Sequence, residues 1–177
     1  MKQYSPNVKM KSIDEGVIDF HGVAGIDTSQ MIKIGLRIKE QMKREVGQWM
    51  RINVGIGTNR FLAKMAAGLH KPDGLDVVDH RNVVAMYRNL ELEDLTGIAD
   101  AYGARLRAHN IFTPLQFLEA DGDLLRRRVF KSIHGLHWQQ RLRGFEVDAY
   151  ETSLGMVGRQ WMVKNPSNDD TYLRSCL

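Results

Sequence analysis

The stretch KSIDEG, residues 11–16, places two adjacent carboxylates, Asp14 and Glu15, between two strand-like runs. Residues 8–11 alternate apolar and polar side chains, and residues 17–20 are rich in β-branched and aromatic side chains. This pattern predicts an antiparallel hairpin with both carboxylates at or near its tip.

Adjacent like charges at a tight turn repel each other, and a bound divalent cation relieves that repulsion. Mg²⁺ prefers carboxylate oxygens as ligands, so Asp14 and Glu15 are candidate metal ligands. A solvated acidic turn explains the same residues without any ligand, because acidic side chains are common in turns. The pair alone does not separate these two interpretations.

The composition predicts a soluble globular protein of one domain or two small ones, since 43% of the 177 residues are hydrophobic and 26% are charged. No apolar run is long enough to span a membrane, and the N-terminus lacks the apolar segment of a signal peptide. The single cysteine, Cys176, allows no intramolecular disulfide. We therefore expect a reducing compartment, namely the cytoplasm, or the nucleus in a eukaryote.

The formal net charge is +4, and residues 97–147 hold eight Lys or Arg against five Asp or Glu. A mildly basic middle segment suits nucleic acid, but an ordinary basic surface explains it equally well.

The first ninety residues predict mixed secondary structure: a helix over about 28–46 after a cap at 27–29, a strand over 51–57, a helix over 60–69 after a cap at 58–59, a strand over 75–78 and a helix over 81–88. Glycines 55 and 57 leave bare backbone on one face of the second strand, which something could approach closely. The order of elements predicts an α+β fold, with helices on one face of an antiparallel sheet. It is that of a partial ferredoxin-like unit without its first strand.

From Leu92 onward, short helices are broken by glycine, and TPLQ at 113–116 is a capping box that predicts a further helix start at Thr113. Gly97 before a helix over 101–108 is typical of a helix-hairpin-helix, whose turn points backbone N–H groups at a phosphate. A second glycine hinge over 133–136 precedes a helix over 137–143, and basic residues lie between the hinges. This arrangement predicts a clamp on a duplex backbone. A plain helical bundle with its arginines in solvent is the alternative.

Other chemistry has little support. The chain has no glycine-rich phosphate loop followed by Lys-Ser/Thr, and its histidines are too scattered to favour a zinc site. Cys176 lies in the tail, which argues against a Cys/His nucleophile.

The motifs together resemble the Y-family lesion-bypass DNA polymerases of the DinB/UmuC type. SIDE at 12–15 resembles their acidic motif, residues 53–66 their second palm strand and following helix, and KPDG at 71–74 their KP-x-G turn. LTGIA at 95–99 resembles the thumb hairpin, residues 135–144 the second thumb hinge, and TSLG at 152–155 the opening of the linker to the little finger. The order and spacing of these motifs extend the resemblance over nearly the whole chain.

The sequence also departs from the family pattern. In this family a first strand carries another metal-binding aspartate, and the steric-gate aromatic and the fingers follow it. This chain begins just before the SIDE hairpin, and most of the little finger is missing. Thr96 and Ala99 replace a proline and a glycine of the thumb hairpin. Two-metal phosphoryl transfer needs carboxylates that bridge both ions, so we expect this chain to be inactive alone.

The resemblance implies a partial palm over 1–91, a helix-hairpin-helix thumb over 92–148, and a linker with the truncated start of the little finger over 149–177. It implies template-directed nucleotidyl transfer from a dNTP to a primer 3′-hydroxyl in damage tolerance, with two Mg²⁺ ions in the complete parent. Asp14 and Glu15 would be catalytic and metal-facing, and Lys71 and Lys64 would bind the nucleotide. The implied DNA-binding residues are Gly97, Ile98, Ala99, Arg105, Arg126, Arg127, Arg128 and Lys131.

The implied partners are primer-template DNA, a dNTP and, through regions outside this chain, a sliding clamp; no membrane is expected. Two rival hypotheses are a non-catalytic DNA-binding module on the same scaffold and an α+β interaction domain without nucleic acid. Salt-dependent duplex binding separates the latter from the other two.

Overall fold

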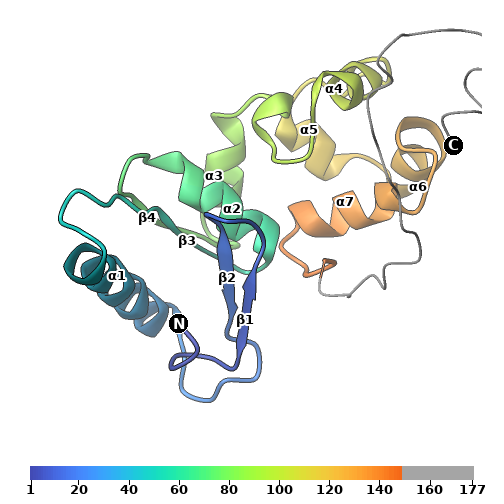
Figure 1. The fold of residues 1–177 in the computed structure, drawn as a ribbon. Helices are drawn as coiled ribbons and strands as arrows, with labels where there is room; N and C mark the ends of the chain where they lie inside the picture. Colours follow the sequence, from blue (N-terminus) through green and yellow to red (C-terminus); the bar gives the residue numbers. More distant parts are fainter. Residues whose placement is uncertain (149–177) are drawn as a thin grey trace, which may run out of the picture.

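The fold comes from a computed structural model that describes residues 1–148 (Figure 1). The predicted linker and little-finger segment, residues 149–177, lies outside the described residues. Strands β1 (Asn7–Met10) and β2 (Gly16–Asp19) form an antiparallel hairpin in which Met10 pairs with Gly16. The predicted hairpin is therefore confirmed, with its turn at residues 11–15.

A second, separate sheet consists of β3 (Val54–Gly57) and β4 (Leu75–Val78), which run parallel to each other. Helix α2 (Arg60–Leu69) forms the connection between them. The prediction of an antiparallel sheet is wrong for this pair, because a helical crossover returns the chain to the same end of the sheet.

Helices cover both faces of this second sheet, so the prediction of helices on one face is also wrong (Figure 1). A Cβ at Gly35 of α1 (Thr28–Glu45) would lie 3.0 Å from the Val54 side chain. A Cβ at Gly55 would lie 1.9 Å from the carbonyl oxygen of Ala63 on α2. Alternate strand residues face opposite sides, so α1 covers the apolar face and α2 lies against the glycine face.

Three predicted helix caps are confirmed. The Asp27 carboxylate accepts from the N–H of Gln30 at the start of α1, at 2.8 Å. The Asn59 side chain accepts from the N–H of Leu62 at the start of α2, at 2.7 Å. Thr113 caps α5 (Pro114–Glu119). Each side chain satisfies an N–H that has no partner within its own helix.

The remaining part of the described chain is helical. Its elements are α3 (Val83–Arg88), the 3₁₀ turn η1 (Leu92–Asp94), α4 (Asp100–Arg107), α5, α6 (Gly122–Leu124), the π-helical turn η2 (Leu125–Val129) and α7 (His134–Leu142). The first helix of the predicted hairpin is thus a single 3₁₀ turn, and α7 begins earlier than predicted.

One buried cluster joins α2 to the helical part. Phe61 and Leu62 of α2 belong to the same cluster as Phe117, Trp138 and Leu142. The rings of Phe61 and Trp138 meet edge to face, with centroids 5.6 Å apart. Residues on both sides of position 91 therefore share a core. No helix within residues 1–148 is both long and apolar enough to cross a membrane.

Candidate metal and nucleic-acid site

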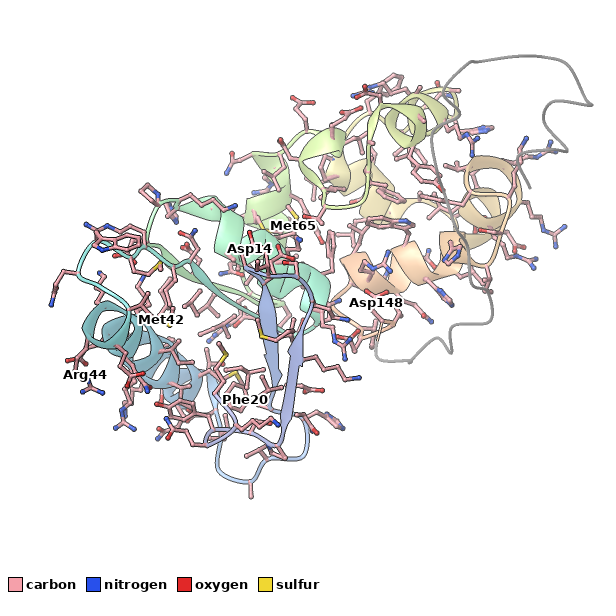
Figure 2. The ribbon with its side chains drawn as sticks, in the orientation of Figure 1. Asp14, Phe20, Met42, Arg44, Met65 and Asp148 are labelled. Atoms are coloured by element: carbon pink, nitrogen blue, oxygen red, sulfur yellow. The ribbon has the colours of Figure 1, made fainter. Side chains whose placement is uncertain are left out.

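The turn between β1 and β2 holds its two carboxylates in an ordered geometry. The Ser12 hydroxyl donates to Oδ1 of Asp14 at 2.6 Å and accepts from the N–H of Glu15 at 3.1 Å. The N–H of Lys11 donates to the carbonyl of Glu15 at 2.8 Å and closes the loop. Residues 11–16 are all exposed, and Figure 2 shows Asp14 at the tip of the hairpin.

The Ser12 hydroxyl, and secondarily a backbone N–H, lowers the pKa of the Asp14 carboxyl below its ordinary value. The nearby Lys64 ammonium makes a smaller contribution in the same direction. A carboxyl with a lowered pKa stays ionised over a wider pH range, as a metal ligand must.

Glu15 contacts a helix that follows much later in the chain. The Lys64 ammonium of α2 donates to both of its carboxylate oxygens, at 2.6 and 2.9 Å, although the two residues are 49 positions apart. Both side chains remain about half exposed, at 47% for Glu15 and 48% for Lys64. The contact joins the hairpin to α2 and brings a positive charge to the acidic turn.

The carboxylate oxygens of this turn fit part of the ligand set of a magnesium site. Glu15 already holds a cationic group with both oxygens, and Asp14 is exposed beside it. Within residues 1–148, no three His, Cys, Asp or Glu side chains gather in a metal-binding cluster. Mg²⁺ is commonly bound by one or two carboxylates together with waters and substrate phosphates, so two carboxylates are a sufficient protein contribution for one ion.

The structure does not bring Lys71 to the acidic turn in the way it brings Lys64. Lys71 is exposed on the turn between α2 and β4, at the edge of the sheet where both strands begin. Within the described chain, neither Asp14 nor Glu15 forms a hydrogen bond or ion pair with it. The nucleotide-binding roles of Lys71 and Lys64 stay predictions.

Two lysines of α1 fix the turn that carries Lys71. The Lys39 ammonium donates to the carbonyls of Ile52 and Asp73, at 2.8 and 2.6 Å, and to Oδ1 of Asp73 at 2.8 Å. Lys43 donates to Oδ2 of the same carboxylate at 2.6 Å. These two contacts lower the pKa of Asp73 strongly. Lys39 is 9% exposed, so its charge is satisfied inside the protein.

Gly97 lies in the turn that is predicted to bind phosphate, directly before α4. Gly97 has φ +99°, a left-handed conformation that L side chains rarely adopt. A Cβ there would lie 3.2 Å from the Trp138 ring. Gly97 is thus required by its conformation and by this packing, in addition to any approach of a phosphate.

Helix α4 begins directly after this turn, and its N-cap residue offers no side-chain hydrogen bond to the first N–H groups of the helix. Its N-cap is Ala99, and the first N–H groups of a helix have no intrahelical partners. Asp100 places a negative charge in the first turn, which opposes an anion there. Arg105 is exposed, with its guanidinium 5.7 Å from the centroid of the Tyr102 ring. Ile98 is buried at 4% exposure and contributes only its backbone.

Of the four basic side chains in residues 126–131, two lie close to an acidic residue and two are exposed without an ion pair in the described chain. Arg126 and Arg127 both approach Asp123, at 3.2 and 3.7 Å. Arg128 and Lys131 are exposed, and neither forms an ion pair within residues 1–148. The predicted DNA-binding role therefore has its strongest candidates in these last two cations.

Gly135 has a packing role. A Cβ at this position would lie 2.5 Å from the backbone nitrogen of Arg126. The second predicted glycine hinge is thus the place where α7 lies directly against η2.

Sequence reasoning missed two residues that organise the site. Lys39 gave no signal because its acceptors are mostly backbone carbonyls brought together only by folding. Asn59 was recognised as a helix cap, but its amide also donates to the carbonyls of Arg141 and Phe145, at 2.8 and 2.9 Å. No local pattern encodes contacts more than eighty residues apart.

The fold is that of Y-family DNA polymerases. A "Y-family DNA polymerase chimera Dbh-Dpo4(243-245)-Dbh" superposes with a TM-score of 0.69 at 22% identity, covering 86% of this chain and 44% of the other. An "Insertion ternary complex of Dbh DNA polymerase" superposes with a TM-score of 0.66 at 23% identity, covering 80% and 40%.

The sequence comparisons agree with this fold. Residues 1–68 match the impB/mucB/samB family. The chain is 36% identical over 145 residues to DNA polymerase IV of Pelotomaculum thermopropionicum, a match that covers 78% of this chain and 35% of that protein. The chain is therefore homologous to a segment of the Y-family DNA polymerases, and it spans about a third of the length of this curated relative.

Proposed function

We propose that this chain is a segment of a lesion-bypass DNA polymerase, with part of the palm over 1–91 and a thumb over 92–148. The parent reaction is attack of a primer 3′-hydroxyl on a dNTP, directed by a template strand. The observation that carries this proposal is the exposed acidic turn, whose Glu15 holds a cationic group with both oxygens while the Asp14 carboxylate is exposed beside it.

In this proposal, Asp14 and Glu15 orient a bound Mg²⁺ with their oxygens, and Lys71 contacts the triphosphate as a point charge. When bound there, Mg²⁺ would supply positive charge to the transferred phosphoryl group and to the attacking oxygen. Polymerases of this family are generally dependent on divalent metals, which supports the role of the acidic pair. The remaining ligands come from substrate phosphates, water and residues outside the described chain.

The helical part contacts the sugar-phosphate backbone of the primer-template. The amides that begin α4, together with Arg105, Arg128 and Lys131, contact phosphates without reading bases. Arg126 and Arg127 contribute less, because Asp123 already engages their charge. Binding by the helical part is therefore expected to be weak, general and salt-dependent.

The test replaces the matching segment of the Pelotomaculum thermopropionicum polymerase with residues 7–91 of this chain. The chimera should extend a primer with Mg²⁺ and dNTPs, and Asp14→Asn or Glu15→Gln in the same chimera should abolish extension. A chimera that folds and extends equally well with both substitutions would exclude the catalytic role. Ser29→Ala, an exposed α1 position, is the matched control and should leave extension unchanged.

A non-catalytic DNA-binding module on the same scaffold is the second candidate. One observation favours it, namely that no group of three metal-ligating side chains occurs within residues 1–148. A chimera that binds duplex DNA, but is inactive before any substitution, would support this second candidate.

A further inference from the structure

The contact between Lys64 and Glu15 occupies the atoms that a metal ion needs. The ammonium lies 2.6 Å from Oε1 and 2.9 Å from Oε2 of Glu15, so both oxygens face the same positive charge. Mg²⁺ binds oxygen ligands at about 2.0–2.1 Å. An ammonium group that holds both oxygens and a divalent cation therefore compete for this carboxylate, because the two positive charges repel each other at such distances.

Lys64 has no second carboxylate on its own helix. The sequence of α2, RFLAKMAAGL, contains no Asp or Glu. Arg60, one turn earlier, is engaged with Glu146 at 3.6 Å and with the carbonyl of Asp148 at 2.9 Å. An ammonium released from Glu15 must therefore find its next anion outside α2.

We propose that Lys64 is a resident counter-charge that a divalent cation displaces from Glu15, and that the displaced ammonium then pairs with a phosphate of the nucleotide bound beside the metal. The inference rests on the proposed metal role of the acidic turn and goes beyond it. It connects two separate predictions, the metal-binding carboxylate pair and the contact of Lys64 with the nucleotide. In this account Lys64 exchanges Glu15 for a phosphate when the metal binds.

The strength of the pair suits such an exchange. Both side chains are about half exposed, and ion pairs in that environment are weak because water and salt screen them. The Asp14 carboxylate is exposed and accepts from the Ser12 hydroxyl through Oδ1 only, so an arriving cation can contact it before it displaces Lys64 from Glu15. In the absence of metal, Lys64 relieves the repulsion between the two adjacent carboxylates.

The first experiment follows Mn²⁺ binding by paramagnetic broadening of the backbone amide resonances of residues 12–16 in the full 177-residue chain. Lys64→Met should lower the apparent Kd by about threefold, the effect of removing one half-exposed ion pair. Lys64→Arg should bind as the parent does, because the guanidinium can also hold Glu15. Lys33→Met, the same change at an exposed position of α1, should not alter the Kd.

The outcomes separate this inference from the proposed function. Equal Mn²⁺ affinity for the parent and a folded Lys64→Met variant would overturn the exchange and leave the metal role intact, as would weaker binding by the variant. Absence of broadening at residues 12–16 in both proteins would overturn the exchange and the metal role together. Amide resonances elsewhere in the spectrum report whether the variant is folded.

A second readout follows Lys64 itself. Acetylation by a water-soluble ester, quantified by mass spectrometry, should be faster at Lys64 when Mg²⁺ is present, because the freed amine loses its carboxylate partner. Adding tripolyphosphate with Mg²⁺ should slow labelling at Lys64 again, while labelling at Lys33 stays constant. Labelling of Lys64 that does not respond to Mg²⁺ at concentrations that saturate residues 12–16 would overturn the inference.

Discussion

The side-chain amide of Asn59 donates to the backbone carbonyl of Arg141 at 2.8 Å, across 82 residues of sequence. The same amide donates to the carbonyl of Phe145 at 2.9 Å, while the side-chain oxygen caps α2 by accepting from the N–H of Leu62 at 2.7 Å. One side chain, 5% exposed, thus joins the start of α2 to the end of α7. Asn59 therefore connects the part of the chain that contains the β3–β4 sheet (the sheet part) to the helical part that follows it.

Asn59→Ala should lower the free energy of unfolding by about 2–4 kcal/mol. The loss of the helix cap contributes about 1 kcal/mol, and the loss of the two part-buried hydrogen bonds to the carbonyls of Arg141 and Phe145 contributes the rest. Urea unfolding followed by circular dichroism measures the change.

Thr113→Ala is the matched control, because Thr113 caps α5 through the N–H of Gln116 at 3.2 Å and forms no comparable bridge. It should cost only about 1 kcal/mol. Equal losses for the two variants would show that the contacts of Asn59 with α7 contribute nothing to stability.

Two glycines should respond in opposite directions to alanine. Gly97→Ala should destabilise the protein by about 1–3 kcal/mol, because φ is +99° and the new methyl would lie 3.2 Å from Trp138. Gly68→Ala should stabilise it by about 0.5–1 kcal/mol, because Gly68 is helical and, within residues 1–148, no atom beyond its chain neighbours and its own helix backbone lies within 4 Å of the added Cβ. Thermal unfolding of both variants checks the pair of signs, and a stable Gly97→Ala protein would contradict the strained turn. A bulkier residue at 97 is therefore a poor probe of DNA binding.

Acid should destabilise the turn between α2 and β4, in which Asp73 pairs with Lys39 and Lys43. Hydrogen bonds from these two lysines lower the pKa of Asp73 strongly, and the Arg81 side chain lowers the pKa of Asp79 to about 2. A carboxyl whose folded pKa lies below its unfolded value, near 3.9, stabilises the fold above that value. This stability is lost as the pH falls from about 4 through the folded pKa.

Urea midpoints measured between pH 7 and pH 2 should therefore be flat above about pH 5 and fall below pH 4. Asp73→Asn should lower the midpoint at neutral pH and flatten the fall below pH 4. A variant as acid-sensitive as the parent would show that other carboxylates control the transition.

Much of the fold follows from local patterns in the sequence. Strand-like runs on both sides of residues 11–16 predict the hairpin, and Asp27, Asn59 and Thr113 mark three helix starts correctly. The parallel pairing of β3 and β4 was missed although a signal existed. A connection that contains a whole helix is typical of parallel strands, and a ferredoxin-like interpretation obscured it.

The candidate site was predictable as a list of residues but not as an arrangement. SIDE at 12–15 locates the acidic turn, yet nothing in its spacing shows that Glu15 meets Lys64, because that contact depends on how the hairpin leans on α2. Similarly, the run of three arginines does not reveal that Asp123 engages two of them. Such contacts depend on tertiary packing, which local periodicity does not encode.

The purified 177-residue chain should not extend a primer. It spans 35% of its DNA polymerase IV relative, and within residues 1–148 its acidic turn is not joined by a third metal-ligating side chain. Two-metal transfer requires more carboxylates than this turn supplies. Extension assays with Mg²⁺, with Mn²⁺ and with excess protein should all give no product, while the chimera described above serves as the positive control. Robust extension by the chain alone would refute this prediction.

The chain should nevertheless bind duplex DNA through the exposed cations of its helical part. Each phosphate neutralised by a cation contributes about 0.9 to the slope of log affinity against log salt. Arg128→Ala and Lys131→Ala should therefore each reduce the slope by about one unit, because both side chains are exposed and unpaired within the described chain.

Arg81→Ala is the matched control for net charge. Asp79 already holds Arg81 at 2.5 Å in the sheet part, so its removal should leave the slope unchanged. Fluorescence anisotropy with a labelled duplex at several salt concentrations measures all three. Binding should also be independent of base sequence, since phosphate contacts carry no sequence information. Equal slopes for Arg128→Ala, Lys131→Ala and the parent would move the DNA interface away from the segment between η2 and α7.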